Sequence, residues 1–478
     1  MELKSVFNSE PKSIFDTLSE SGICFYLPAY QRHYAWSKKN VERLFEDIIH
    51  GLENTVRNED AITFIGTILT IHDTKYSTIK PFVRGQVPAK VMLIIDGQQR
   101  LTTMLLVMAA LHESLRVNIR KLDKLLNAIK LESGSEDNLV DIDSLVDRLN
   151  QEVANLRHFS TDTNSNKDKL FRWYPKIIRA YKDCWSKTED NAEYVSPIAK
   201  FLHDYNSHVL ACDEGGKISI FRYEFDEKSR DLEGYSILAR NYKLIKQKIK
   251  LISDSNSEES KIPSFSELAE GKFRDAFQFD FPVSLSDKDQ RFNVFRESVN
   301  LLIFSKYLLN RVCLTYVTVA DESYAFDMFE ALNTTGEPLT SLETFKPKVI
   351  DFEGLESYEK SVSKTYFDTI DGFLDGIADP REKNNQTNRI MMLFGLVETG
   401  DKLTKHISDQ RRYLIDKYRP LDGQGKRDFL KNLSQVVKYL YEEWEPLQPN
   451  SFSDVTDEKN QILMCHELLK EVNHEMAS

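Results

Sequence analysis

The chain has 478 residues, 41% of them hydrophobic, which is enough for two or three packed units. Acidic residues outnumber basic ones by 75 to 63, and the formal net charge of -12 argues against a protein whose whole surface binds nucleic acid, although it allows a local basic surface. Five scattered cysteines argue against a zinc site and a disulfide framework, and the lack of a signal-peptide core or a long apolar run predicts a cytoplasmic protein with no membrane partner.

Apolar runs with strand character occur in the first hundred residues and once more, much later in the chain. Apolar residues at helical spacing lie between them, and they predict one helix over residues 40–49 and a longer one over 101–115. Strand-like runs and helices are therefore mixed in the first hundred residues, which we interpret as the opening of an α+β fold. The predicted strands cover residues 24–27, 63–71, 91–95 and 313–319.

The rest of the chain is mainly helical in pattern, with one helix predicted over residues 324–332 and further helices from 351 to the end. Clusters of small and polar residues interrupt this pattern, and such residues favour turns and loops. These expected loops cover residues 132–138, 161–166, 253–260 and 381–387.

The pattern as a whole predicts an α+β core with a large helical insertion, followed by an all-α C-terminal region. The core is expected over residues 1–120, and the mainly helical insertion over 121–262. A strand-helix-loop segment over 263–350 would complete the core, and the all-helical region would cover 351–478.

The most informative stretch is Asp96-Gly97-Gln98-Gln99-Arg100, which directly follows one predicted strand and opens the longer predicted helix. We expect Asp96 to cap this helix and Gly97 to allow a tight backbone. A helix N-terminus offers unpaired N–H groups, and Arg100 adds a guanidinium that fits phosphate oxygens. The stretch therefore fits an anion site, but it fits equally well an ordinary capped helix with solvated side chains.

A second cluster, residues 27–36, combines a proline and closely spaced aromatic residues with Gln and Arg. Its rings can stack on a nucleobase or pack against helices, while its polar side chains can contact phosphate or base edges. By itself the cluster favours the structural interpretation, with the rings as core anchors and the arginine paired with a carboxylate such as Asp47. The residues concerned are Tyr30, Gln31, Arg32, Tyr34 and Trp36.

Two further stretches have two interpretations each. Residues 329–340 contain Asn333 and Gly336, which would either close a loop over a ligand or simply end a helix. Residues 170–182 alternate cations with rings, which suits nucleic-acid contact, but a buried helix edge with Lys and Arg stems looks the same and is favoured.

In their order along the chain, these blocks resemble the N-terminal domain of GmrSD-type modification-dependent restriction endonucleases. The resemblance covers about residues 20 to 345, and its most specific part is the Asp-Gly-Gln-Gln-Arg block. The matching positions are Pro28, Tyr30, Gln31, Arg32, Tyr34, Trp36, Asp47, Phe64, Gly66, Asp96 through Thr103, Phe329, Leu332, Asn333, Gly336, Leu339 and Thr340.

The resemblance implies a ParB- and sulfiredoxin-like core that binds and hydrolyses a nucleoside triphosphate (GTP, ATP or CTP) with Mg²⁺ or another divalent cation. It implies catalytic roles for Asp96, Gln98, Gln99 and Arg100, with Asp96 also holding the metal. The chain has no Gly-Lys-Ser/Thr phosphate loop, so P-loop chemistry is not the source of such activity. The implied nucleotide-binding residues are Tyr30, Gln31, Arg32, Tyr34, Trp36, Gly97, Thr102, Asn333 and Gly336.

The chain departs from the family pattern at its C-terminal end. Full-length relatives often carry a His-Asn-His-like nuclease domain there, whereas His406, His466 and His474 lie apart and no such motif follows. We therefore expect a bacterial anti-phage or restriction component whose nucleotide hydrolysis gates attack on foreign, modified DNA. A nuclease partner subunit, DNA bound at a local basic surface, nicking by the chain itself and a homo-oligomer all stay open. The alternative is a non-hydrolysing ParB-like switch or scaffold.

Overall fold

The structure, a computed structural model, divides into two compact units, Met1–Ala325 and Phe326–Ser478. The predicted limits at residues 120 and 350 both fall inside helices, which are α3 (Gln98–Leu131) and α11 (Ser341–Glu353). The structure describes residues 6–20, 22–28, 31, 33–74, 88–131, 136–157, 159, 161–162, 174–179, 183, 185, 194, 196–223, 234–254, 262–263, 293–320, 324–325, 328, 340–358, 360–377 and 379–444.

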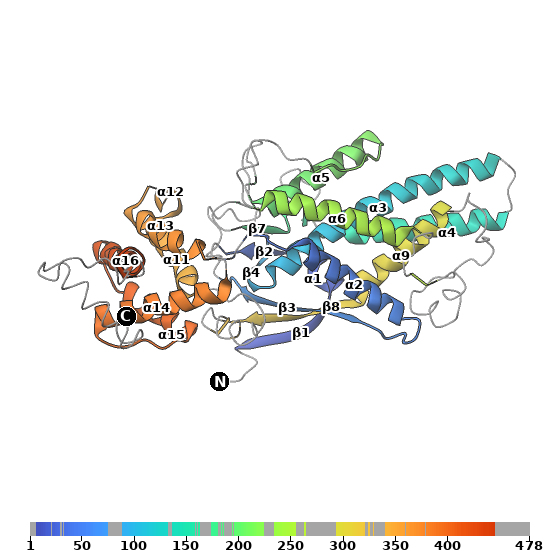
Figure 1. Cartoon of the computed structure of the whole chain (residues 1–478). Helices are drawn as coiled ribbons and strands as arrows, with labels where there is room; N and C mark the ends of the chain where they lie inside the picture. The colour runs from blue at the N-terminus through green and yellow to red at the C-terminus, as the bar shows by residue number, and fades with distance from the viewer. Residues whose placement is uncertain are drawn as a thin grey trace, which may run out of the picture. The chain divides into compact units, whose positions relative to one another are not determined.

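A six-stranded mixed sheet forms the base of the first unit, with strand order β1-β8-β3-β4-β2-β7 (Figure 1). The pairs β1/β8 and β3/β4 are antiparallel, and the other three neighbouring pairs are parallel. All four predicted strands are confirmed, as β2, β3, β4 and β8. The strands are β1 (Phe7–Ser13), β2 (Ile23–Leu27), β3 (Thr63–His72), β4 (Lys90–Asp96), β7 (Ile177–Arg179) and β8 (Val312–Val319).

Helices cover one face of this sheet, and α3 lies in the middle of them, beside α4, α6 and α9 (Figure 1). The α+β class is therefore confirmed, while the ParB- and sulfiredoxin-like likeness stays a prediction. Two short strands, β5 (Thr161–Asp162) and β6 (Tyr174–Pro175), form a separate antiparallel pair. The other helices that the structure describes in this unit are α1 (Ile14–Leu18), α2 (Lys38–Asn54), α4 (Glu136–Arg157), α5 (Pro197–Gly215), α6 (Tyr235–Ser253) and α9 (Asn293–Asn310).

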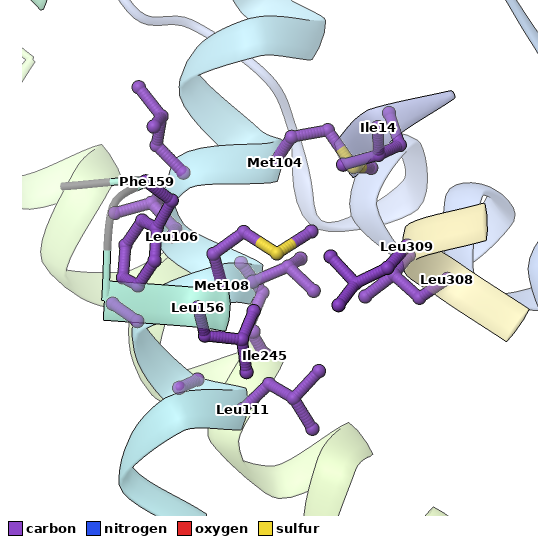
Figure 2. Packing of buried hydrophobic residues seen from close by; sticks show 14 of the residues in the cluster. Ile14, Met104, Leu106, Met108, Leu111, Leu156, Phe159, Ile245, Leu308 and Leu309 are labelled. Atoms are coloured by element: carbon purple, nitrogen blue, oxygen red, sulfur yellow. The ribbon is translucent and has the colours of Figure 1, made fainter. Parts of the chain in front are cut away.

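The main hydrophobic core lies between α3 and its neighbours. Met104, Met108 and Leu111 of α3 point toward side chains of several other helices (Figure 2). These partners include Ile245 of α6 and Leu308 of α9, all buried. The opposite face of the sheet packs a smaller cluster, which consists of Cys24, Tyr26, Val91, Ile178, Trp185, Tyr194 and Ala199. Because both faces are covered at β2, β4 and β7, the ends of these strands are where this part of the sheet can present chemistry.

The cation-rich stretch 170–182 is not a helix edge, because its described part forms β6 and β7. Lys176 and Arg179 are both buried there, and each donates to a backbone carbonyl, of Glu20 and of Gln31 respectively. A cation that is buried and bonded in this way does not meet a phosphate backbone. These two residues therefore do not belong to a nucleic-acid surface.

Several predicted loops are wrong in part. Residues 381–387 are helical, within α14 (Pro380–Thr399), because Asp379 accepts from the Arg381 N–H as N-cap and Pro380 takes the first helical position. Glu136–Asn138 open α4, and Thr161 and Asp162 form β5. Residues 255–260 and most of the predicted helix 324–332 lie outside the described residues.

The second unit is all-helical where it is described, as predicted. Its core is aromatic: Phe345 meets Tyr418 edge-on with ring centroids 5.1 Å apart, and Phe394 meets Phe429 at 5.0 Å. Its elements are α11, α12 (Leu355–Tyr358), α13 (Val362–Asp375), α14, α15 (Ile407–Tyr418), α16 (Gly423–Lys438) and the π-helical turn η4 (Tyr439–Trp444). Across the described parts of both units, no helix has the length and apolarity needed to cross a membrane.

His112 on α3 makes the stability of the fold depend on pH. Burial lowers the pKa of His112 to about 3, and its Nδ1 lies 2.7 Å from the Tyr205 hydroxyl. In the unfolded chain the imidazole of His112 takes up a proton near pH 6.5, whereas in the folded chain it stays neutral at that pH. The free energy of unfolding therefore falls as the pH drops. Between pH 6 and 4.5 we expect the free energy of unfolding of the native chain to fall by about 1.4 kcal/mol per pH unit more than that of His112→Gln. Urea unfolding followed by fluorescence measures this difference, and parallel pH profiles would contradict it.

Candidate functional site

The junction between β4 and α3 holds the polar block that the sequence singles out. β4 ends at Asp96 and α3 begins at Gln98, so Gly97, not Asp96, occupies the N-cap position. The carbonyl of Gly97 accepts the first helical hydrogen bond, from the Leu101 N–H at 3.0 Å. The expectation that Asp96 caps the helix is therefore wrong, because the strand continues one residue further than the apolar run.

Gly97 is required at this junction for two reasons. Its φ is +90°, a backbone conformation that side chains disfavour. A Cβ there would also lie 2.9 Å from the Thr67 carbonyl oxygen and 2.9 Å from Cγ1 of Ile68. Because Thr67 and Ile68 belong to β3, the missing side chain lets the start of α3 approach the neighbouring strand directly.

Arg100 lies over a second glycine of β3. The register of β3 against β8 shifts between Phe64 and Thr67, which is a β-bulge, and Gly66 within it has φ +109°. Nη1 of Arg100 donates to the Thr67 carbonyl at 3.0 Å, and a Cβ on Gly66 would lie 2.9 Å from Cζ of the guanidinium. The bulge therefore holds the guanidinium beside the first turn of α3.

Gln31 joins the first cluster to this junction. Its buried side chain donates through Nε2 to the Ile95 carbonyl at 2.5 Å, one residue before Asp96. Its own carbonyl accepts a hydrogen bond from Arg179 of β7. Two blocks far apart in the sequence thus meet at the C-terminal end of β4. Tyr30 and Arg32 lie outside the described residues, so their expected place beside Arg100 stays a prediction.

Gln99 is held at both ends of its side-chain amide. Its Oε1 accepts from the Ala35 N–H at 2.9 Å, and its Nε2 donates to the His33 carbonyl at 2.9 Å. In this structure Gln99 therefore fixes the segment 33–36, which from here on means His33 to Trp36. Gln98, the other glutamine of the block, is buried.

The described aromatic residues of the first cluster serve packing. Tyr34 is buried, and its hydroxyl lies 2.8 Å from Oγ1 of Thr103 on α3. Trp36 is partly buried against the main core, and its carbonyl accepts from Asn241 of α6 at 2.8 Å. Of the two uses weighed for these rings, packing is the one that the contacts account for. Nucleotide binding by Tyr34 and Trp36 stays a prediction.

Other expected site residues are placed less directly. Thr102 is fully enclosed in the first turns of α3, and Asp96 is half-buried at the end of β4. Asn333 and Gly336 lie outside the described residues. No group of three His, Cys, Asp or Glu side chains that could hold a metal ion occurs in the described part of the chain. Mg²⁺ bound by one carboxylate commonly takes its further oxygen ligands from phosphate and from water.

A comparison with known protein families identifies the family of the chain. The model of the GmrSD restriction endonuclease N-terminal domain matches residues 12–350, a range that holds β2 to β8 and every expected site residue. The chain belongs to the GmrSD N-terminal domain family. This membership assigns it to a restriction system. A search of curated proteins gives no match.

Two residues of this GmrSD-family junction were not predicted from the sequence. Asn241 of α6 donates to the Trp36 carbonyl, and Arg179 donates to the Gln31 carbonyl. Arg179 lies in the stretch 170–182, which the sequence offers for nucleic-acid contact and not for this junction, and Asn241 is 207 positions from its partner Tyr34. The sequence shows Asn241 only as one polar residue of the insertion that is expected to be mainly helical, whereas the structure shows it buried and bonded, as buried polar groups normally are.

Substitution of Gly97 tests the close approach of α3 to β3. Gly97→Ala adds a Cβ against backbone at a positive φ, whereas Gly216→Ala adds one at φ +60° with nothing within 4 Å. Both substitutions introduce backbone strain of roughly 1–3 kcal/mol, but only the substitution at position 97 adds a steric clash. We expect Gly97→Ala to lower the melting temperature clearly more than Gly216→Ala. Equal effects in a thermal melt would contradict the close approach.

Proposed function

We propose that this GmrSD-family chain binds a nucleoside triphosphate at the first turn of α3 and hydrolyses it with Mg²⁺, and that this step gates attack on foreign, modified DNA. The observation that carries the proposal is the meeting of Asp96, Gly97 and the guanidinium of Arg100 at one end of the sheet. Gly97 removes side-chain bulk, and the other two residues supply opposite charges for a metal and for phosphate.

Phosphate binding is supported by the start of α3. The first N–H groups of a helix have no partner within it, and the helix dipole adds positive partial charge. α3 is long, with 34 residues, and Leu101 is the first residue whose N–H bonds back, to Gly97. Arg100 is held next to these groups by the Thr67 carbonyl, so most of its remaining donors stay available for phosphate oxygens.

Metal binding would fall to Asp96. Mg²⁺ takes oxygen ligands and commonly binds one or two carboxylates together with phosphate oxygens and water. When bound, it would supply charge neutralisation of the phosphates. With Asp96 as its protein carboxylate, the site would fit a cation that arrives with the nucleotide, and it would fit a free cation less well.

The side chains of the block would then divide the work. Arg100 would neutralise charge that grows on the transferred phosphoryl group, and Gln98 would orient the attacking water. Gln99 would act as a positioning residue, since both ends of its amide already hold backbone groups of the segment 33–36. This division differs from the simplest expectation, in which the two glutamines are equivalent.

Cleavage of DNA is proposed to depend on a second component. The described residues contain no His-centred cluster that could hold a nuclease metal. A nuclease partner subunit whose action depends on the nucleotide state would fit this arrangement, and so would a homo-oligomer that presents DNA to it. Lys176 and Arg179 are buried, so DNA contact must use other cations.

The non-hydrolysing switch is the second candidate, and one observation favours it. Both ends of the Gln99 amide are bound to backbone groups, so Gln99 does not orient water in this conformation. A site that holds phosphate firmly but positions water poorly would bind nucleotide without useful turnover.

Substitution of Arg100 separates these candidates. Arg100→Ala removes the guanidinium beside the phosphate site, and Arg120→Ala is its matched control, because Arg120 lies on the same helix and also donates to a backbone carbonyl, of Ile218 at 2.9 Å. We expect Arg100→Ala to reduce phosphate release from GTP, ATP or CTP by about 100-fold and Arg120→Ala to leave it unchanged. Binding without release in the native chain would support the switch. Absence of any nucleotide-dependent rise in melting temperature would leave the scaffold.

Asp96→Asn tests the metal. The amide keeps the shape of the carboxylate but removes the charge that a divalent cation needs. We expect Mg²⁺ to increase nucleotide affinity about tenfold or more in the native chain and hardly at all in Asp96→Asn. The measurement is a nucleotide titration with and without Mg²⁺. Equal dependence on Mg²⁺ in both proteins would remove Asp96 from the metal site.

A further inference from the structure

Asn241 of α6 is a fully buried amide that reaches the segment 33–36. Its Nδ2 donates to the Trp36 carbonyl at 2.8 Å and to the Tyr34 hydroxyl at 3.2 Å, so both of its amide hydrogens are used. Its Oδ1 has no hydrogen-bond partner in the described structure. A buried acceptor without a partner costs free energy, so a contribution to the stability of the fold does not by itself explain this asparagine.

The hydrogen bonds beyond Asn241 have a defined direction. The Thr103 hydroxyl donates its single proton to the Gln99 carbonyl at 2.8 Å. The Tyr34 hydroxyl, 2.8 Å from Oγ1 of Thr103, must therefore be the donor in that contact. Burial raises the pKa of the Tyr34 phenol, so this proton is retained at neutral pH. The result is one chain of donors from Asn241 through Tyr34 and Thr103 to Gln99.

This chain ends in the first turn of α3. Gln99 accepts through its carbonyl from Thr103, while its side chain holds the carbonyl of His33 and the N–H of Ala35. The segment 33–36 is therefore fixed by α3 on one side and by Asn241 of α6 on the other. Hydrogen bonds in such a buried chain strengthen one another, so loss of the first donor affects the last acceptor.

We propose that Asn241 is a positioning residue that holds the first turn of α3, through Tyr34 and Thr103, in the conformation that binds nucleotide. The effect on nucleotide affinity rests on the proposed function, whereas the effect on the first turn of α3 does not. Asn241 thereby links the helical part of the first unit to the junction at the end of β4.

Asn241→Asp is the sharpest test, because it keeps the shape of the side chain and reverses one of its roles. A carboxylate accepts from the Tyr34 hydroxyl, and this turns the phenolic proton away from Thr103. Asn300→Asp on α9 is the matched control, since Asn300 is also buried and its Nδ2 donates to a carbonyl, of Ser253 at 3.1 Å, far from the junction. If the Asp variant fails to fold, Asn241→Ala replaces it.

Two readouts follow from the proposal. Hydrogen exchange of the peptide 97–104 should become at least several-fold faster in Asn241→Asp and stay as in the native chain in Asn300→Asp. The affinity for a fluorescent analogue of GTP, ATP or CTP should fall about tenfold in the first variant and change less than twofold in the second. Equal changes in both variants would reduce Asn241 to an ordinary structural residue and overturn the proposal.

A double-mutant cycle shows whether Asn241 acts through Tyr34. Tyr34→Phe removes the next link, so Asn241→Ala should change exchange and affinity much less in its presence than in the native chain. Additive effects would overturn the chain of donors. If the native chain binds none of the three nucleotides, the proposed function fails, and hydrogen exchange alone then decides the positioning role.

Discussion

The close approach of α3 to β3 is the constraint on which the candidate site depends. It exists because two glycines remove side chains where the elements meet: Gly97 faces the Thr67 carbonyl, and Gly66 faces the guanidinium of Arg100. A Cβ on Gly97 would press against the backbone of β3 and push the first turn of α3 away from the sheet, whereas a Cβ on Gly66 would displace the guanidinium of Arg100. The helix start, the strand end with Asp96, and the cation would then separate, and no common ligand could reach all three.

The fold was predictable where hydrophobic patterning decides it and not where capping or pairing does. The buried strands β2 and β4 are nearly continuous apolar runs, as strands covered on both faces must be. β1 was missed because Phe7–Ser13 is an edge strand that carries Pro11 and charged residues, which protect an edge but hide its pattern. The start of α14 is charged and polar, and its apolar residues come later, so hydrophobic patterning predicts a loop there. Asp379 as N-cap and Pro380 are the signals that mark it as the start of a helix.

The candidate site was predictable in its membership more than in its roles. Gln31 and Gln99 do lie at the junction, but both amides bind backbone groups there. From the sequence, an amide that holds the chain and an amide that orients water look alike, because hydrogen-bond partners distant in sequence decide between them. Asn241 could not be predicted for the same reason. No sequence motif marks it, since its role depends on the contact of α6 with the segment 33–36.

The net charge of the chain and the proposed phosphate site are compatible because they act over different distances. A net charge of -12 sets a repulsive field around the whole protein, but salt screens that field within about 10 Å. At contact distance the helix dipole and Arg100 dominate. Thermodynamic linkage between nucleotide binding and the chain of donors has a further consequence. If Asn241 holds the first turn of α3 in its nucleotide-binding conformation, nucleotide must stabilise the contact of α6 with the segment 33–36 by the same free energy. A partner that breaks the contact of α6 with the segment 33–36 would weaken nucleotide binding by that same free energy. The helical part of the first unit would therefore be coupled to the nucleotide state without contacting the nucleotide.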